Sequence, residues 1–589
     1  MRATFSGLNT MVRGIIANQV SLDTTGHNIT NAGTDGYSRQ AVNLATTYSQ
    51  DVNSLKGNAV VGTGVDVLSI QRARNVYADV QYRNENPMQK YYETLATNYD
   101  KVETIFDDSQ DLGIAQSIGD FYQSWVDLST SASNSSSRVN TIEQGRNLSD
   151  ILQTKTTELQ EQINLEYEDI KAEVGQLNDI LENIVKLNKQ IVAKETNGST
   201  ANDLRDSRDL LVDDLCNYLN VSVTEDDFGS YQINSSGITL VNGFARAHLE
   251  MSNGVSSAYL GTDYGITDYS IKIAESNIVF LPAGGTLKAH FDAITEDKGY
   301  IDKLANIAGY LLTAFNEQHK QGWDIDGHST VDSTGETIPN TINFYGLDGM
   351  TYEYRYDADR QINYIYKYDE DDTTDPNNTN NKVNGEMMSG VRIIEALEVN
   401  TRFDENNGDR YIAAATSKEY VETSAGVGIW ENLEWGDRTG DGTNAVYLSE
   451  LFNIAFDTIL SDGKANAEIL QEHCKLKDTD GNLIDITGES VTEPVYYSMT
   501  NKLSINAYYQ KAVSTLGTNS YSVDQNYEAM QSIMVQINNW RDSTAGVDWN
   551  EELTNMIKFQ KGYSASARCL TAMDEMLDRL VNSTGAVGR

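Results

Sequence analysis

Apolar residues recur at steps of three and four near both ends of the chain, with polar residues between them. This spacing places the apolar side chains on one face of an α-helix. A short helix alone is marginally stable in water, so each stripe needs a partner surface. The partner can be the other end of the chain or a neighbouring copy, which makes both ends a candidate assembly interface. We assign to this interface Phe5, Leu8, Val12, Ile15, Leu22, Leu553, Met556, Tyr563, Leu570, Leu577 and Leu580.

The longest helical pattern lies inside the chain, from residue 137 to residue 194. Between Leu148 and Ile191 the apolar residues keep the same steps, with Lys155 as the one polar exception. At 1.5 Å per residue this helix would form a rod of roughly 85 Å. Its sustained spacing predicts coiled-coil-like packing against other helices. Further helical patterns cover residues 72–131, 204–219, 286–320, 443–475 and 501–540.

Alternating apolar and polar residues predict β-structure between the helical segments. Residues 38–70 are typical of a short hairpin, and residues 221–285 of short strands with Gly and Ser turns. Residues 321–440 are acidic, strand-like and rich in Asn, Gly and Tyr, and residues 476–497 indicate a turn-rich β excursion. The block 321–440 has helical sequence before and after it, as an inserted domain would.

The order helix, β, helix, β, helix predicts an α+β multidomain protein, which agrees with a chain of 589 residues. We expect an elongated, coiled-coil-like helical stalk formed by both termini, with inserted β-rich domains. The expected parts are a terminal assembly domain (1–37 and 545–589), a helical stalk domain (38–220, 286–324 and 441–544), a small β-rich segment (221–285) and an outer β-rich domain (325–440).

The charge of the chain excludes two classes of partner. Its 86 acidic and 44 basic residues give a net charge of −42, and its Lys and Arg residues form no cluster that would bind phosphate groups. We therefore expect neither nucleic acid nor membrane as a partner. No run of about eighteen apolar residues exists, and Arg13 and Gly14 interrupt the N-terminal apolar stretch that a signal peptide would need. This favours a cytoplasmic protein and leaves open export without a cleaved signal.

Motifs for catalysis or metal binding are incomplete in this sequence. The three cysteines are far apart and suggest neither disulfides nor a zinc site. The acidic loops 437–442 and 478–482 partly resemble calcium loops, but the first has Leu448 where a bidentate glutamate belongs, so turns are favoured. His319 has no implied acid or base partner and is expected to anchor a loop. We predict no enzyme activity, no cofactor and no metal.

Residues 24–39 (TTGHNITNAGTDGYSR) resemble the N-terminal signature of bacterial flagellar rod, hook and hook-associated proteins. Gly33 and Asp35 depart from that signature, which usually has Asn and Pro there. More specific similarity to hook-associated proteins lies in 202–211 (NDLRDSRDLL), 315–324 (FNEQHKQGWD), 440–445 (GDGTNA) and 546–553 (GVDWNEEL), followed by Phe559 and Gln560. These segments cover both ends and the helical middle, whereas residues of about 325–440 and 456–500 carry no quotable similarity.

The resemblance implies a structural junction protein between flagellar hook and filament, located outside the cell and exported by the flagellar type III apparatus without a cleaved signal. It also implies several partners, namely copies of the chain in a ring, the hook protein, the second, filament-side hook-associated protein and an export chaperone that binds the C-terminal helix. In this setting Asp206, Arg208 and Asp209 are expected to form helix-packing salt bridges.

Two other interpretations remain open from the sequence. A hook or distal rod protein of the same family is one, although helical sequence around residues 205–211 and 316–324 argues against it. A secreted hydrolase or glycan-binding protein displayed on the flagellum is the other, with its function in residues 325–500. A catalytic cluster in that region would favour this second interpretation.

Overall fold

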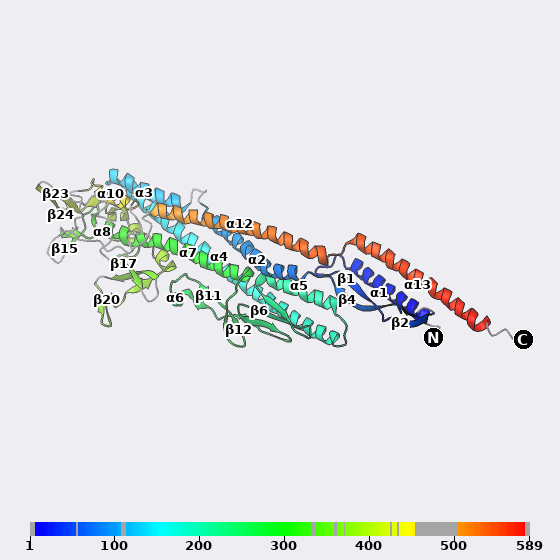
Figure 1. Cartoon of the computed structure of the whole chain (residues 1–589). Helices are drawn as coiled ribbons and strands as arrows, with labels where there is room; N and C mark the ends of the chain where they lie inside the picture. The colour runs from blue at the N-terminus through cyan, green and yellow to red at the C-terminus, as the bar shows by residue number, and fades with distance from the viewer. Residues whose placement is uncertain are drawn as a thin grey trace.

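The computed structural model describes residues 6–583 apart from the segments 55–56, 108–112, 332–336, 358–361, 370, 425–426, 433–434, 437 and 454–503. The molecule is elongated, with a bundle of long helices in the middle, both chain termini at one end, and β-structure around the other end, along one side of the bundle and beside the terminal helices (Figure 1). No helix in these described ranges is long and apolar enough to cross a membrane.

The helices agree with the periodicity of the sequence. The predicted helix 137–194 is confirmed as α4, which runs from Ser135 to Glu195 and begins where the Asn134 side chain accepts the Ser136 N–H at 2.9 Å. The helices are α1 (Ser6–Thr30), α2 (Val76–Ile105), α3 (Ile114–Thr130), α4, α5 (Asn202–Tyr218), α6 (Ser257–Leu260), α7 (Gly285–Tyr310), α8 (Asn316–Lys320), α9 (Val391–Glu395), α10 (Thr443–Glu450), α12 (Ile505–Ala545) and α13 (Trp549–Ser583), with a π-helical turn at Leu311–Phe315 and 3-10 turns at Thr401–Asp404 and Gly408–Tyr411.

The strands form small antiparallel sheets rather than one large sheet. Among the described residues, the sheet with the most strands is a four-stranded meander. Its strands are β5 (Ser222–Glu225), β6 (Tyr231–Ser235), β7 (Ile238–Asn242) and β8 (Ala245–Arg246). The other pairings near the stalk are β9 (Leu249–Met251) and β13 (Val279–Phe280) on either side of β12 (Ile271–Ile273), and β10 (Val255–Ser256) with β11 (Thr267–Asp268).

The outer strands also pair locally. They are β14 (Gly322–Trp323) with β22 (Ala415–Thr416), β15 (Ser329–Val331) with β16 (Thr337–Pro339), β17 (Met350–Asp357) with β18 (Ile362–Asp369) and β21 (Glu386–Met388), β19 (Thr374–Asp375) with β20 (Asn378–Lys382), and β23 (Lys418–Ser424) with β24 (Val427–Asn432).

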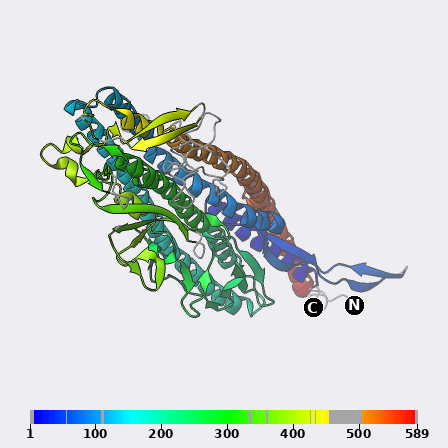
Figure 2. The same ribbon diagram turned by 90° about the vertical axis from the view of Figure 1, so that its left-hand side faces the viewer.

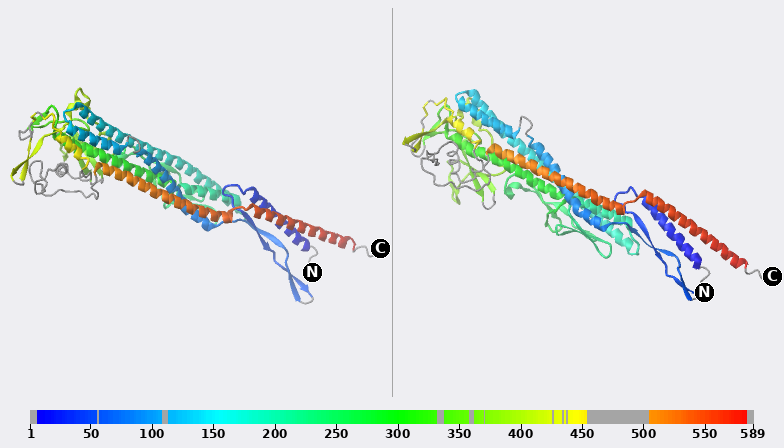
Figure 3. Two further views of the ribbon diagram at one scale, coloured as in Figure 1. Left: turned by 90° about the horizontal axis from the view of Figure 1, so that it is seen from above. Right: turned by 45° about the horizontal axis from the view of Figure 1, so that its top comes forward.

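A long β-ribbon separates α1 from the stalk. Its strands are β1 (Gln40–Thr46), β2 (Gln50–Ser54), β3 (Gly57–Val61) and β4 (Val65–Arg72), with β1 paired to β4 and β2 to β3. The ribbon projects from the stalk beside the terminal helices (Figures 2 and 3). The predicted hairpin therefore exists, but the glycines at 62 and 64 lie between β3 and β4 and not at the tip.

The core of the molecule is continuous through the helical stalk. Leu148, Leu152, Leu159 and Ile163 of α4 are fully buried, and α4 packs against α3, α5 and α7. Lys155, the polar exception in the stripe, keeps its ammonium beside Glu158 at 3.0 Å. The α4 stripe therefore buries its apolar side chains within a single copy of the chain.

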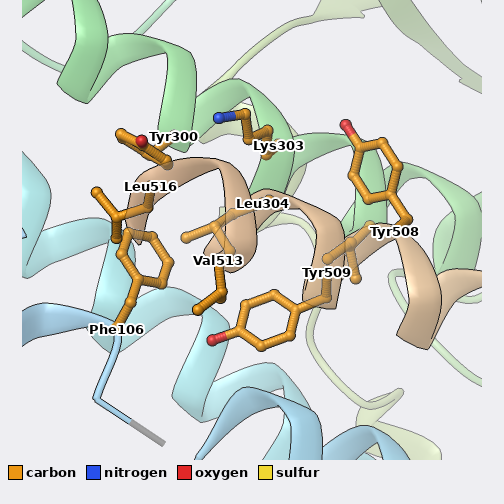
Figure 4. A pocket seen from close by; sticks show the side chains of 10 residues that line it. Phe106, Tyr300, Lys303, Leu304, Tyr508, Tyr509, Val513 and Leu516 are labelled. Carbon is orange, nitrogen blue, oxygen red and sulfur yellow. The ribbon is translucent and has the colours of Figure 1, made fainter. Parts of the chain in front are cut away.

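Helix α12 crosses back along α2 from the outer end of the stalk to its base. Figure 4 shows where its first turns meet the end of α2 and the side of α7, with Phe106, Tyr300, Leu304, Val513 and Leu516 around a gap of about 10 Å³. A gap of this size holds at most about one water molecule. The contact is thus a packed helix seam and not a ligand pocket.

Residues 325–440 do not form a purely outer domain as expected, because some of their side chains are buried in the core of the stalk. Phe344 packs against Phe121 of α3 and Phe315 at ring-centroid distances of 5.6 Å each, and Tyr345 and Phe403 are buried in the same core. The apolar residues of this block complete the outer end of the stalk, while its acidic, turn-rich sequence forms surface strands. Of the expected helix 443–475, α10 is seen, whereas residues 454–475 and the expected β excursion 476–497 lie outside the described residues.

Candidate assembly interface at the terminal helix pair

Helices α1 and α13 lie side by side and antiparallel at the end of the molecule that carries both termini (Figures 1 and 3). Small residues line the seam between them. A Cβ added to Gly7 would lie 2.1 Å from the Met573 methyl group, so the Met573 side chain packs directly against the Gly7 position. The seam contacts pair Gly7 with Met573, Gly14 with Ser566 and Asn18 with Gly562.

The predicted apolar stripe of α1 does not lie in this seam. At about 100° per residue, Ile16 lies on the side of α1 opposite Gly7. Ile16 is 51% exposed and Val12 is 40% exposed. Leu8, Ile15 and Leu22 lie between the two sides and are partly buried. Among the described residues, the stripe therefore has no complete partner.

The β-ribbon covers a third side of α1. The Thr10 hydroxyl donates to the Thr63 carbonyl at 3.2 Å, and Arg13 pairs with Asp66 of β4 at 2.6 Å. With α13 on one side and the ribbon on another, the side of α1 that stays open among the described residues carries the apolar Val12 and Ile16 and the polar Asn9 and Gln19.

Helix α13 also keeps apolar residues in solvent. Leu553 is 46% exposed, Ile557 59%, Tyr563 40% and Met576 61%, whereas the predicted Met556, Leu570 and Leu577 are partly buried. Phe5 lies outside the described residues, and Leu580 belongs to α13 but its side chain is not among those described. The structure thus gathers the described stripe residues on one helix pair without bringing the two stripes fully together.

An elbow joins α13 to the end of α12. Helix α12 ends at Gly546, and the Asp548 carboxylate accepts the Asn550 N–H at 2.7 Å at the start of α13. Arg39 fixes the elbow, because its backbone N–H donates to the Ala545 carbonyl at 2.9 Å. Its guanidinium pairs at 2.7 Å with both Glu551, which is exposed, and Glu552, which is buried.

The N-terminal signature folds the chain from α1 into the ribbon. Asn28 is 1% exposed and makes two hydrogen bonds to the backbone of Gln40. Its side-chain NH2 group donates to the Gln40 carbonyl and its side-chain oxygen accepts the Gln40 N–H, each at 2.9 Å. The Tyr37 hydroxyl donates to the same oxygen at 2.7 Å. Ser38 donates to Asp206 of α5 through its N–H at 3.0 Å and its hydroxyl at 2.7 Å. The signature therefore ties α1 to the base of the stalk.

A buried ion network stands at that base, between the ribbon, α2, α5 and α12. Asp209 accepts from Arg72 and Arg74 at 2.8 Å each and from Arg83 at 3.3 Å. A second group joins α12 to α2 and α5, where Arg541 contacts Asp79 at 3.0 Å and also pairs with Asp213. Asp206, Asp209 and Asp213 lie three and four residues apart, so α5 presents all of them on one face.

The network sets the charge state of its carboxylates. Burial alone would raise the pKa of Asp209, but Arg74 and Arg72 outweigh it and lower that pKa to about 2. Burial dominates at Asp213 and raises its pKa in spite of Arg541. The expected salt bridges of Asp206 and Asp209 are present, but they join separate elements. Arg208 pairs with Glu225 of β5 at 3.6 Å, and its guanidinium also stacks on Tyr231 at 3.4 Å and donates to the Gly229 carbonyl at 2.6 Å.

A cleft of about 520 Å³ opens beside the network, lined by Tyr37, Arg74, Tyr82, Asp213 and Arg541 among others. It lies between the signature segment, α2, α5 and the last turns of α12. Charged side chains that already pair with one another form much of its lining, so we assign it to the joint between the terminal pair and the stalk.

The candidate catalytic and metal residues have structural roles. His319 is fully buried, bonds the Ile342 carbonyl through Nδ1 at 2.9 Å and accepts the Ala413 N–H at Nε2 at 3.0 Å, so it anchors two loops as expected. Burial lowers its pKa to about 4. Asp441, from the first acidic loop, accepts the Thr443 N–H at 2.9 Å in a turn, and residues 478–482 lie outside the described ranges.

The residues that hold the joint were missed by the analysis of apolar stripes. The two glycines Gly7 and Gly14 are seven residues apart, a spacing that could have indicated a close helix seam. Asp206 and Asp209 were expected in salt bridges, but the arginines at 72, 74 and 83 were not identified as their partners, although their spacing and opposite charge could have indicated an ion network. Arg39 and Glu552 had no such signal, because their pairing depends on the three-dimensional path of the whole chain.

Comparisons with known proteins agree with this architecture. Residues 99–333 match the model of the flagellar hook-associated protein FlgK helical domain. Residues 541–583, which begin at Arg541 and include all of α13, match the model of the flagellar basal body rod FlgEFG protein C-terminal.

Full-length relatives carry the similarity through the chain. The chain is 29% identical over 598 residues to flagellar hook-associated protein 1 of Bacillus subtilis (strain 168), covering 100% of both. It is 24% identical to that of Escherichia coli (strain K12), over 98% of this chain and 99% of the relative. The structure of the flagellar hook junction protein FlgK from Burkholderia pseudomallei shares the fold, with a TM-score of 0.53, 14% identity, and coverage of 79% of this chain and 100% of the other. The chain is therefore similar over its full length to flagellar hook-associated protein 1 of other bacteria, and its helical middle matches the FlgK helical domain.

Proposed function

We propose that this chain is a structural, non-enzymatic subunit of the bacterial flagellum that joins hook to filament. The observation that carries the proposal is the terminal helix pair, in which apolar sides of α1 and α13 stay open after the contacts among the described residues are made. Exposed apolar surface of this kind marks an interaction site. Full-length relatives named flagellar hook-associated protein 1 support the same role.

The open sides suit copies of the same chain arranged in a ring. The apolar side of α1 and that of α13 are different surfaces, so contact between them is head-to-tail and can close into a ring. Further partners that we propose are the hook protein, the second, filament-side hook-associated protein and an export chaperone on α13. The family implies a flagellar location outside the cell, and we propose export without a cleaved signal.

The alternative functions receive less support. Similarity to a helical domain of hook-associated proteins disfavours a hook or distal rod protein. In the outer region, His328 lies 2.5 Å from Asp324, but Asp324 also accepts two backbone N–H groups of its own turn. Among the described residues, no serine, threonine or cysteine is seen bonded to His328, so this pair does not favour a hydrolase.

Val12→Asp tests the assembly interface in a strain that lacks the chromosomal copy. We expect the variant to be exported and folded, because Val12 is 40% exposed, yet to leave hooks without filaments in electron micrographs. A charge in an apolar contact costs several kcal/mol when it is buried without a partner. The matched control is Leu165→Asp on α4, where the leucine is 58% exposed, and filaments should grow normally.

Normal filament growth with Val12→Asp would remove α1 from the interface. Loss of filaments with both variants would show that an added surface charge is harmful anywhere on the chain. Normal filaments in a strain from which this chain has been deleted completely would contradict the proposed function itself.

A further inference from the structure

A histidine of α7 lies between two carboxylates of α4 in the middle of the stalk. Nδ1 of His290 is 2.5 Å from Glu166, and Nε2 is 3.5 Å from Glu173. Glu173 is held in turn by the Thr286 hydroxyl, which donates to it at 2.7 Å. His290 and Glu166 are both buried, so the ring has a fixed orientation between the helices.

Asp169 adds a third possible ligand beside His290 and Glu166. Ligand atoms of Glu166, Asp169 and His290 all lie within 4.8 Å of one another. Asp169 is exposed, and within the described part of the chain its carboxylate has neither an ion pair nor a hydrogen bond. This carboxylate is therefore available to bind an ion beside the histidine.

Glu173 occupies the place of a partner that orients a metal-binding histidine. Such histidines usually give one ring nitrogen to the metal and donate the other N–H to a carboxylate. Nδ1 of His290 faces Glu166, and Nε2 faces Glu173, which matches this arrangement. Lys101 contacts Glu166 through Oε1 at 3.1 Å, so Oε2 remains on the side of the histidine.

We propose that His290, Glu166 and Asp169 bind one divalent transition-metal ion, with zinc as the best fit, between α4 and α7. One imidazole with two carboxylates suits zinc, whereas calcium and magnesium prefer ligand sets made of oxygen alone. Water completes the coordination on the exposed side of Asp169. The ion links two stalk helices, and this role is independent of the proposed function of the terminal pair.

Asp169→Asn tests the site with little risk to the fold, because Asp169 is exposed. The full-length chain is freed of metal with a chelator and titrated with zinc chloride in a calorimeter. We expect one equivalent of zinc in the wild type and at least about tenfold weaker binding in Asp169→Asn. Melting temperatures in chelator should be equal for the two proteins, and zinc should raise only that of the wild type.

Glu168→Gln is the matched control, since Glu168 is the exposed neighbour and pairs with Lys171 at 3.1 Å. Its zinc affinity should equal that of the wild type. Absence of zinc uptake by the wild type would overturn the proposal. Equal zinc affinity of Asp169→Asn and wild type would also overturn it, and so would an equal loss in Glu168→Gln, which would indicate diffuse binding to an acidic surface.

Discussion

The stalk and the terminal helix pair both derive from apolar stripes of similar spacing, yet only the stalk buries its stripe within one chain. Leu152, Leu159 and Ile163 of α4 have no solvent-accessible surface, whereas Val12 is 40% exposed and Leu553 is 46% exposed. The stripe pattern therefore indicates that a helix needs a partner but not where that partner is. A stripe that stays open after the chain has folded indicates a partner outside it.

Charge separates the same two regions. Residues 1–37 contain two basic and two acidic side chains, and residues 545–589 contain five basic and six acidic ones. Residues 38–544 therefore carry −41 of the net charge of −42. Like charges repel at close range. The nearly neutral termini can thus pack closely between copies, while the acidic stalk favours solubility.

Asp209→Ala should have the largest effect on the stalk. The change leaves Arg72, Arg74 and Arg83 short of a buried counter-ion, which costs about 3–5 kcal/mol of unfolding free energy. Denaturation by urea, followed by circular dichroism, measures it. Asp214→Ala on the same helix is the control and should change stability by less than about 0.5 kcal/mol. Equal stability of both variants would show that the network does not hold the base of the stalk.

Leu159→Ala and Leu553→Ala compare the two stripes directly. Leu159 is fully buried, so its truncation should cost about 2–5 kcal/mol. Leu553 is 46% exposed, and its truncation should stay within about 0.5 kcal/mol. The same denaturation curves give both values. A large loss with Leu553→Ala would mean that the terminal pair is as self-sufficient as the stalk.

His319 should make the outer end of the stalk sensitive to acid. Its pKa falls from 6.5 in the unfolded chain to about 4 in the fold, so the unfolded chain binds the proton first. This stability is present above pH 6.5 and is lost as the pH falls through 4, by on the order of 3 kcal/mol. His319→Gln should show a flatter dependence between pH 6.5 and 4 in denaturation curves. Parallel curves for the two proteins would contradict this assignment.

The smallest expected difference in stability between the stalk and the terminal pair is that between Gly145→Ala in α4 and Gly562→Ala in α13. A Cβ at Gly145 would lie 2.6 Å from the rigid Phe344 ring, and this overpacking costs about 1–3 kcal/mol. A Cβ at Gly562 meets only the flexible Asn18 side chain, and the better helix propensity of alanine offsets that contact. Thermal melts measure both, and a larger loss for Gly562→Ala would reverse the comparison.

Periodicity and motif resemblance predicted much of the fold because they depend on neighbours in sequence. Helix α4, the β-ribbon and the two terminal helices follow from local spacing, whereas the antiparallel packing of the terminal helices on each other does not. The seam of Gly7, Gly14 and Gly562 was missed, because the analysis followed apolar residues and small residues carry no apolar signal. Phe344 and Tyr345 were assigned to an outer domain since their sequence surroundings are acidic, although their side chains complete the core of the stalk.

The ion pair between Arg39 and Glu552 joins residues that are 513 positions apart in the chain. Contacts of such long range form late, because the intervening chain must first lose its freedom. Packing of α2 against α12 brings both partners to the same place and removes most of this cost. We therefore expect the terminal pair to form last during folding, after the stalk. Stopped-flow mixing with hydrogen exchange would show protection in α12 before α13. In a chain that passes through an export channel from one end to the other, the assembly surface would then stay unformed until the last residues had emerged.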